Sequence, residues 1–193
     1  MSMKRKAFTL AEVLITLAII GVVAAMTIPA LMNSTNQQEF KTAFKKSIAV
    51  LNQAITMNIA LDNSDSNAYS AYTTSTTPAE QMMAYFSQRM NVISSTTGAN
   101  ASITTADGMQ YFFKKGGTCL TTGSNPQITA ASPASGCYIL VDVNGAKKPN
   151  AVSKVGNIKD QFYIAIMDNS AIPAYDAISG GGGDVAQQIM YAN

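Results

Sequence analysis

The chain has 193 residues and a formal net charge of +2, which favours one domain with appended segments. Histidine is absent, so the commonest general base and the commonest metal ligand are missing, and this argues against a hydrolase or a zinc enzyme. Three of the thirteen Lys and Arg residues lie within residues 1–7, and the rest of the chain has ten basic against eleven acidic side chains. That near-neutral balance argues against nucleic-acid binding by the body of the protein.

A short basic segment, MSMKRKA at residues 1–7, precedes a long apolar run. Residues 13–31 contain no charged side chain, and as a helix they would span about 28 Å, close to the hydrocarbon thickness of a bilayer. A secretory signal has a shorter apolar core of about 7–15 residues followed by a small-x-small cleavage site. Length and charge alone therefore indicate an uncleaved signal anchor.

An acidic residue, Glu12, lies at the start of this apolar run. A carboxylate within a membrane segment is costly, so it indicates a function by default. Alternatively, Glu12 lies at the interface and reaches the headgroups at little cost. Charge and position alone leave both interpretations open.

The residues around Glu12 decide between them. The segment KRKA-FTLAEVLITLAIIGVVAAMTIPAL, residues 4–31, resembles the amino-terminal signal of type IV prepilins and type II secretion pseudopilins. In those families a prepilin peptidase cuts before the apolar run, and the new terminal residue is N-methylated. The resemblance implies cleavage between Ala7 and Phe8, with Phe8 as the first mature residue and Glu12 as the fifth. The family usually has Gly before the cut, and this chain has the similarly small Ala7.

The resemblance also implies a role. The protein would be a structural subunit without enzymatic activity or a required cofactor, stored in the bacterial inner membrane by a single span with its head in the periplasm or outside. Its partners would be other pilin-like subunits, the prepilin peptidase and the assembly platform of the inner membrane. Glu12 would act in assembly of the pilus or pseudopilus. Pilus, secretion and competence systems share this signal, so the signal does not choose among them.

The helical pattern continues beyond the membrane segment as one apolar stripe of an amphipathic helix that ends near Leu61. Its members are Phe40, Phe44, Ile48, Leu51, Ile55 and Ile59. Within the apolar half, Gly21 and Pro29 predict a kink or local unwinding, because proline removes a backbone hydrogen bond. We therefore expect three segments: a leader at 1–7, a transmembrane and filament-core helix at 8–31, and an amphipathic helix with a globular head at 32–193.

The head is expected to contain a second helix and a small sheet. Thr77, Pro78 and Glu80 form a capping pattern that predicts a helix over residues 78–91. Strand-like runs cover residues 109–113, 138–143 and 161–167. A three- or four-stranded antiparallel sheet packed on the first helix would give an α+β, pilin-like fold. The tail, which starts with four glycines at residues 180–183, is expected to be mobile.

The two cysteines, Cys119 and Cys137, bracket a loop rich in Gly, Ser, Thr and Pro. If this region is exported to an oxidising compartment, we expect a disulfide between them. Two buried free thiols are the alternative.

Oxygen-bearing side chains gather around an Asn-Gly turn after the second strand-like run. Asp142, Asn144, Asn150 and Asp160 are candidate calcium ligands, because calcium takes several carboxylate and amide oxygens. The segment is not an EF-hand, since Ser153 stands where a bidentate Glu would be required. A hairpin and loop stabilised by Asx turns is the competing interpretation. The stretch D-x-N-G-x-K-x-P-N resembles one found in pseudopilin heads, and major pseudopilins hold calcium in a loop near the sheet.

Two other functions compete with the filament subunit. A competence pilin for DNA uptake would use a local basic patch at Lys147, Lys148, Lys154 and Lys159. A signal-anchored periplasmic enzyme or binding protein would need a catalytic or ligand-binding constellation. The motifs G-x-S-x-G and H-E-x-x-H and a phosphate-binding loop are all absent from the sequence.

Overall fold

The computed structural model describes residues 8–115, 119, 121, 127–128, 136–154, 156–176 and 182–191. The chain forms two compact units, Met1–Glu39 and Phe40–Asn193, and the second unit is called the head below. The predicted leader, residues 1–7, lies outside the described residues.

The described part of the first unit is almost entirely helical. Helix α1 spans Leu10–Asp62 and so also supplies the first element of the head. Helical structure continues through Gly21 and Pro29. Of the two expected alternatives, a kink or local unwinding, the unwinding is not present in residues 10–39, all of which the structure describes. Thr27 uses its hydroxyl to donate a hydrogen bond of 3.0 Å to the carbonyl oxygen of Val23, one turn earlier.

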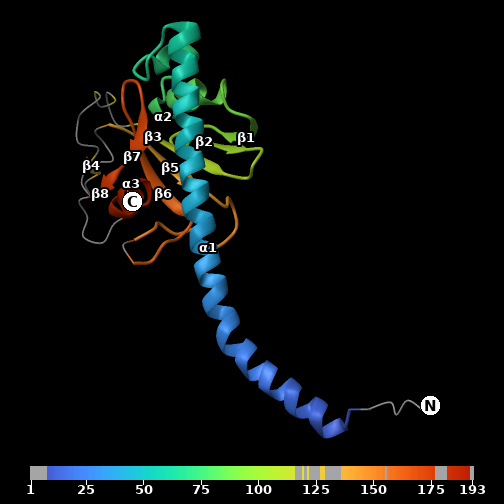
Figure 1. The fold of residues 1–193 in the computed structure, drawn as a ribbon. Coiled ribbons are helices and arrows are strands. Elements are labelled where there is room, and N and C mark those ends of the chain that lie inside the picture. The colour runs from blue at the N-terminus through green and yellow to red at the C-terminus, as the bar shows by residue number, and fades with distance from the viewer. Residues whose placement is uncertain are drawn as a thin grey trace, which may run out of the picture. The chain divides into compact units, whose positions relative to one another are not determined.

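The head contains a six-stranded sheet in which every neighbouring pair is antiparallel (Figure 1). In spatial order its strands are β1 (Val92–Thr96), β2 (Ser102–Thr105), β3 (Gln110–Lys115), β5 (Cys137–Asp142), β6 (Gln161–Ile166) and β7 (Ala171–Pro173). Two short strands, β4 (Gln127–Ile128) and β8 (Tyr175–Asp176), pair in parallel. The remaining elements are a 3-10 helix η1 (Tyr69–Tyr72), helix α2 (Pro78–Ser87) and helix α3 (Gly182–Tyr191). The predicted α+β arrangement is confirmed.

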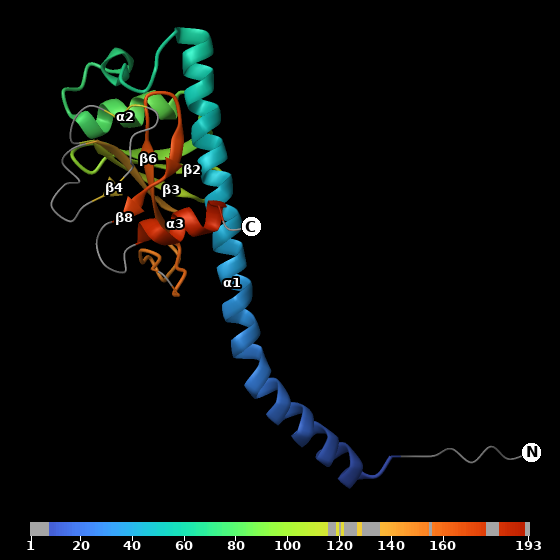
Figure 2. The same ribbon diagram turned by 60° about the vertical axis from the view of Figure 1, so that its left-hand side comes forward.

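Side-chain alternation along β5 and β6 explains how the sheet divides its two faces. Ile139, Val141 and Ile164 belong to the main core, whereas Tyr138 and Ala165, which are cross-strand partners, belong to a small cluster on the other face. This period of two is the pleat of a strand. The main core also receives buried residues from α1, α2 and α3, so all three helices pack on the same side of the sheet (Figure 2).

The predicted apolar stripe of the amphipathic helix is confirmed within the head. Four of its members are buried and the two at its ends are partly buried: Phe44, Ile48, Leu51 and Ile55, then Phe40 and Ile59. Phe44 stacks on Phe162 of β6 with 4.5 Å between ring centroids. The helix therefore lies against the sheet through the residues that recur every three or four positions.

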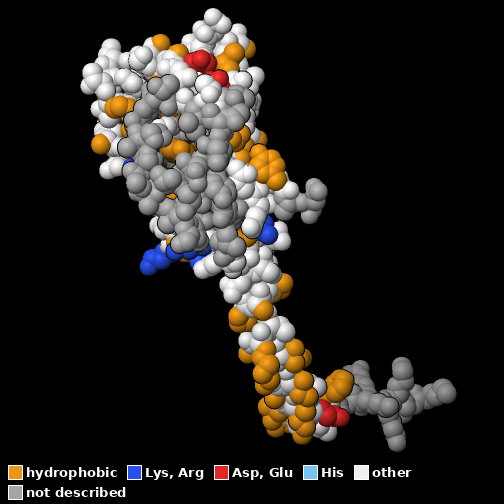
Figure 3. Space-filling view, turned by 90° about the vertical axis from the view of Figure 1, so that its left-hand side faces the viewer, with side chains coloured by type: hydrophobic (Ala, Val, Ile, Leu, Met, Phe, Trp, Pro, Cys, Tyr) orange, Lys and Arg blue, Asp and Glu red, His pale blue; other side chains and the backbone are white. Residues whose placement is uncertain are grey.

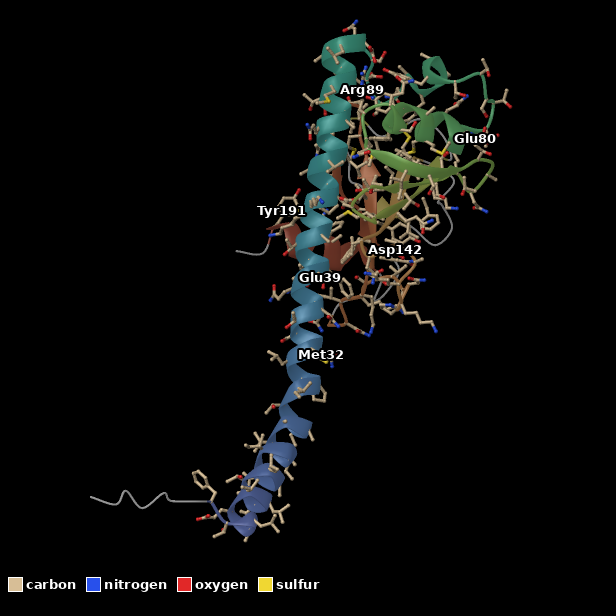
Figure 4. All side chains as sticks on the ribbon, turned by 90° about the vertical axis from the view of Figure 1, so that its right-hand side faces the viewer. Met32, Glu39, Glu80, Arg89, Asp142 and Tyr191 are labelled. Carbon is tan, nitrogen blue, oxygen red and sulfur yellow. A yellow bond between two sulfur atoms is a disulfide. The ribbon has the colours of Figure 1, made fainter. Side chains whose placement is uncertain are left out.

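The capping pattern predicted for α2 is wrong in detail. The backbone of Thr77 is extended before the helix, but its side chain makes no capping hydrogen bond. Glu80, labelled in Figure 4, instead accepts hydrogen bonds from the hydroxyl of Ser75 and from the backbone N–H of Gly98. The acidic side chain thus joins α2 to the turn between β1 and β2. The helix also ends at Ser87, earlier than the predicted residue 91.

The sheet has six strands and not the three or four expected, and several elements were not predicted: strands β1, β2, β4, β7 and β8, the 3-10 helix η1 and helix α3. Strands β1 and β2 lie in a Ser/Thr-rich stretch, where buried Ser102 and Thr105 hide the usual alternation of apolar and polar residues. The glycine-rich tail, expected to be mobile, forms α3 and buries Ala186 and Ile189 in the main core. Tertiary burial overrides the weak helix propensity of glycine in its first turn.

Cys119 and Cys137 are joined by a disulfide in the structure, with 4.9 Å between their Cα atoms. Both residues are buried in the main core. The backbone N–H of Cys119 donates to Oδ1 of Asn67 at 3.1 Å, which fixes this end of the bridge to the connection that follows α1.

Replacing both cysteines with serine should destabilise the head by about 3 kcal/mol, because the bridge closes a loop between positions 18 residues apart. Denaturant unfolding of the detergent-solubilised chain would measure the loss. Reduction of the wild-type chain is the matched control, since it removes the cross-link and leaves the side-chain volume. Complete alkylation of both thiols in native, unreduced protein would contradict the bridge.

Candidate functional site

A capping box starts α1 at the position singled out in the sequence. The backbone N–H and the hydroxyl of Thr9 both donate to Oε2 of Glu12, at 2.8 and 2.9 Å. The backbone N–H of Glu12 donates back to Oγ1 of Thr9 at 3.3 Å. These reciprocal bonds satisfy donors that have no partner within the first helical turn. The carboxylate of Glu12 is therefore held beside the first residues of the predicted mature chain.

The apolar part of α1 exposes its large side chains. Phe8 and Leu10 are 87% and 80% exposed, and every Leu, Ile and Val from 13 to 31 is more than 40% exposed. Figure 3 shows hydrophobic side chains gathered along the helical segment outside the head. An exposed apolar surface of this extent indicates a membrane or protein partner. By length and composition α1 is able to cross a membrane.

Polar contacts fix the position of α1 along the sheet within the head. The side-chain amide of Asn52 donates to the carbonyl of Ala171 at 2.9 Å and accepts from its N–H at 2.8 Å. It therefore pairs with the backbone of β7, an edge strand, in the way a neighbouring strand would. Lys46 forms a 2.8 Å ion pair with Asp107, in the turn between β2 and β3. Although burial opposes it, the hydrogen bonds from Lys46 and Thr105 hold the pKa of Asp107 below its ordinary value.

Arg89 joins the end of α1 to the segment after α2 (Figure 4). Its Nε donates to Oδ1 of buried Asn58 at 2.8 Å, and its Nη2 lies 2.6 Å from Oδ2 of Asp62. The hydroxyl of Tyr72 donates to the same carboxylate oxygen at 3.0 Å. The hydrogen bonds from Arg89 and Tyr72 lower the pKa of Asp62, so the carboxylate remains charged.

The four candidate calcium ligands lie at the last residue of β5 and in the loop between β5 and β6. Asp160 is fully buried and accepts hydrogen bonds from the backbone N–H groups of Asn150 at 2.7 Å and Ala151 at 2.9 Å. Asp142 accepts from the backbone of Asn144 at 3.3 Å and from the side chain of Gln161 at 2.9 Å. The two carboxylates thus point inward and organise the loop, as the Asx interpretation expects.

Burial is the main cause that raises the pKa of Asp142, and the nearby charge of Asp160 adds to it. Oδ1 of Asn144 is buried and has no hydrogen-bond partner. An unpaired buried oxygen two residues along the chain from a carboxylate with a raised pKa fits a cation, which would favour the charged form of the carboxylate. Among the residues the structure describes, no group of three or more Asp, Glu, His or Cys side chains surrounds a single point. A calcium ion would therefore depend on amide and backbone oxygens beside Asp142 and Asp160.

Of the residues predicted for processing, the structure describes Phe8 but not Ala7, which lies outside the described residues. Residues 2–28 match a family model described as the prokaryotic N-terminal methylation motif. The chain carries the type IV pilin and pseudopilin signal. The predicted resemblance is confirmed for this segment. The pilin-type signal belongs to a family of structural subunits. No curated protein and no solved structure gives a significant match to the chain.

The role of Thr9 within the pilin-type signal was not predicted. Thr9 and Glu12 have the spacing of a capping box, T-x-x-E, directly before the apolar run. That spacing was available in the sequence and would have predicted the two reciprocal hydrogen bonds, from the backbone N–H of Thr9 to the carboxylate and from the backbone N–H of Glu12 to the hydroxyl oxygen of Thr9. The pilin-type signal therefore also contains a helix-start signal.

Proposed function

We propose that this protein is a structural subunit of a type IV pilus-like filament or a type II secretion pseudopilus. The observation that supports this most is the combination of two features in one chain. The methylation motif lies at the start of a long apolar helix, and the same helix continues into the head, where it packs on an antiparallel sheet. A signal anchor on an unrelated domain would not require that combination.

The subunit is proposed to be stored in the inner membrane by its apolar segment, with its head in the periplasm, and then moved into a filament with other pilin-like subunits by an inner-membrane assembly platform. Exposed leucine, isoleucine and valine side chains support this, because the same surface can contact lipid first and neighbouring helices afterwards. Shearing filaments from cells and probing the released fraction for the processed chain would test the proposal. Confinement of the protein to the membrane fraction under assembling conditions would contradict it.

Processing should produce a mature chain that begins at Phe8 with a methylated amine. The reason is that a basic leader is followed directly by F-T-L-A-E, and Ala7 provides a small residue before the cut. Intact-mass and amino-terminal peptide analysis of native protein would measure both changes, and a strain without the prepilin peptidase is the control. A mature terminus beyond residue 24 would indicate an ordinary signal peptide and remove the main support for a filament subunit.

We also propose that the loop between β5 and β6 binds calcium. Asp142, Asn144, Asn150 and Asp160 would supply or position the oxygen ligands. Two observations support this. A cation would give the buried oxygen of Asn144 the partner that it lacks, and it would stabilise the charged form of Asp142, whose pKa is raised.

Calcium at about a hundred times its Kd should stabilise the protein by about 2.7 kcal/mol, which corresponds to a rise in Tm of about 5–10 °C. Thermal unfolding of the solubilised chain with and without calcium would measure this shift. D142A should remove the shift, whereas D65N, in an exposed segment after α1, should retain it. An unchanged Tm up to millimolar calcium would contradict the site.

A further inference from the structure

Six lysines lie at one end of the head and are called the basic rim here. They are Lys41 and Lys45 on α1, and Lys147, Lys148, Lys154 and Lys159 in the loop between β5 and β6. Basic side chains appear along the lower edge of the head in Figure 3. The four that are most accessible, Lys45, Lys147, Lys148 and Lys154, are exposed.

Core packing brings the two parts of the rim to the same end of the head. Phe44 stacks on Phe162, directly after the loop enters β6. Phe40 and Ile158 both pack against the main core, one beside Lys41 on α1 and the other beside Lys159 in the loop. The lysines of α1 and those of the loop therefore belong to one continuous region of the surface.

The positive charge of the rim is not neutralised within the described residues. The ion pairs described there join Lys46 to Asp107 and Arg89 to Asp62, and neither involves a rim lysine. The two carboxylates of the loop, Asp142 and Asp160, are buried and bonded inside it. In formal charge, Glu39, which precedes Lys41 by two residues, and the two carboxylates of the loop offset three of the six charges, which leaves the rim with a net charge of +3.

We infer that the basic rim lies on the anionic phospholipid surface of the membrane that holds the apolar segment. The short length of helix between the apolar segment and the rim supports lipid as the partner. Lys41 follows Leu31 by ten residues of continuous helix, so it lies at most about 15 Å from the end of the apolar segment. The headgroup layer occupies about 5–8 Å of that distance, and the remainder is close to a Debye length of about 8 Å at physiological ionic strength.

A soluble polyanion would have to reach the same lysines within this short distance of the bilayer. Each lysine near an anionic surface contributes attraction that falls off within a Debye length. The rim would therefore keep the head of the stored subunit on the membrane, and the subunit would leave that surface when it enters a filament. The inference depends on membrane anchoring and not on which filament uses the subunit.

Lysine acetylation rates in the full chain would test this inference. The chain is reconstituted, heads outward, into vesicles of phosphatidylcholine alone or with about a third phosphatidylglycerol, and the rate at each lysine is measured by mass spectrometry. Anionic vesicles should slow the reaction of the four loop lysines at least about threefold, and 0.5 M salt should restore it. Lys114 is the internal control, because it lies opposite Tyr138, at the other end of β5 from the loop.

Variants of the helix lysines distinguish protection caused by charge from protection caused only by tethering of the head near the membrane. K41Q/K45Q should weaken the partitioning of the head onto the anionic surface by about 25-fold, about fivefold for each lysine, and so restore most of the acetylation of the loop. K41R/K45R keeps the charge and should retain the protection.

Three results would overturn the inference. The first is equal loop reactivity in both kinds of vesicle. The second is protection in phosphatidylcholine that grows with protein density, which would assign the rim to a second copy of the chain. The third is protection by duplex DNA without protection by anionic lipid, which would assign it to nucleic acid.

Discussion

Replacing Glu12 with leucine is expected to leave membrane insertion and cleavage intact and to lower incorporation into filaments about tenfold or more. Insertion should survive because the segment becomes more apolar. Incorporation should fail because cleavage creates a positive amine at Phe8, and methylation keeps that charge. Two unit charges about 4 Å apart attract by about 4 kcal/mol at an effective dielectric near 20, before desolvation. In a filament core an unpaired amine or carboxylate would be costly.

The capping box gives Glu12 a second role, and a set of matched variants separates the two roles. E12Q keeps a side-chain acceptor for the N–H of Thr9 and removes the charge. T9A keeps the charge and removes the hydroxyl that Glu12 contacts. Loss of a cap costs about 1 kcal/mol, which is far less than the charge pairing. E12Q should therefore resemble E12L, and T9A should assemble nearly as well as wild type.

Each variant would be expressed beside wild type, and the processed membrane pool would be compared with the filaments released by shear. Normal incorporation of E12L would mean that Glu12 lies at the membrane interface and has no role in assembly. Normal incorporation of E12Q with failure of T9A would assign the effect to the start of the helix and not to charge.

Phe44→Ala should destabilise the head by about 3–5 kcal/mol, the cost of a large cavity in a packed core. Phe44 is fully buried and stacks on Phe162 at 4.5 Å, so it joins α1 directly to the sheet. Such a loss is a large share of the free energy of unfolding of a typical domain, which is about 5–15 kcal/mol. We expect the processed subunit to be depleted in cells, because partly unfolded chains are degraded.

Urea unfolding of the solubilised chain, followed by far-UV circular dichroism, would measure the free energy of unfolding. F40A is the matched control, because Phe40 belongs to the same stripe but is only partly buried, and its cost should be clearly smaller. F44L tests the site if F44A does not fold, and it should cost less than F44A, because leucine keeps part of the buried volume but not the stacked ring. Equal losses for F44A and F40A would contradict the role of Phe44.

Features that depend on neighbouring residues along the chain could be predicted without the structure. The uncharged run at 13–31, the F-T-L-A-E segment and the stripe from Phe40 to Ile59 were all predictable, because a membrane span, a processing signal and a helical period are local patterns. The hydrogen bonds between Thr9 and Glu12 were also within reach, since a capping box spans one turn.

Features that depend on distant partners became evident only in the folded head. Strand β2 pairs with β1 and β3 although its Ser and Thr side chains do not alternate with apolar ones, and α3 forms from a glycine-rich tail because Ala186 and Ile189 reach the core. Glu80 turned away from the predicted cap toward Ser75 and Gly98. In each case burial or a hydrogen bond to a remote segment outweighed a local propensity of about 1 kcal/mol or less.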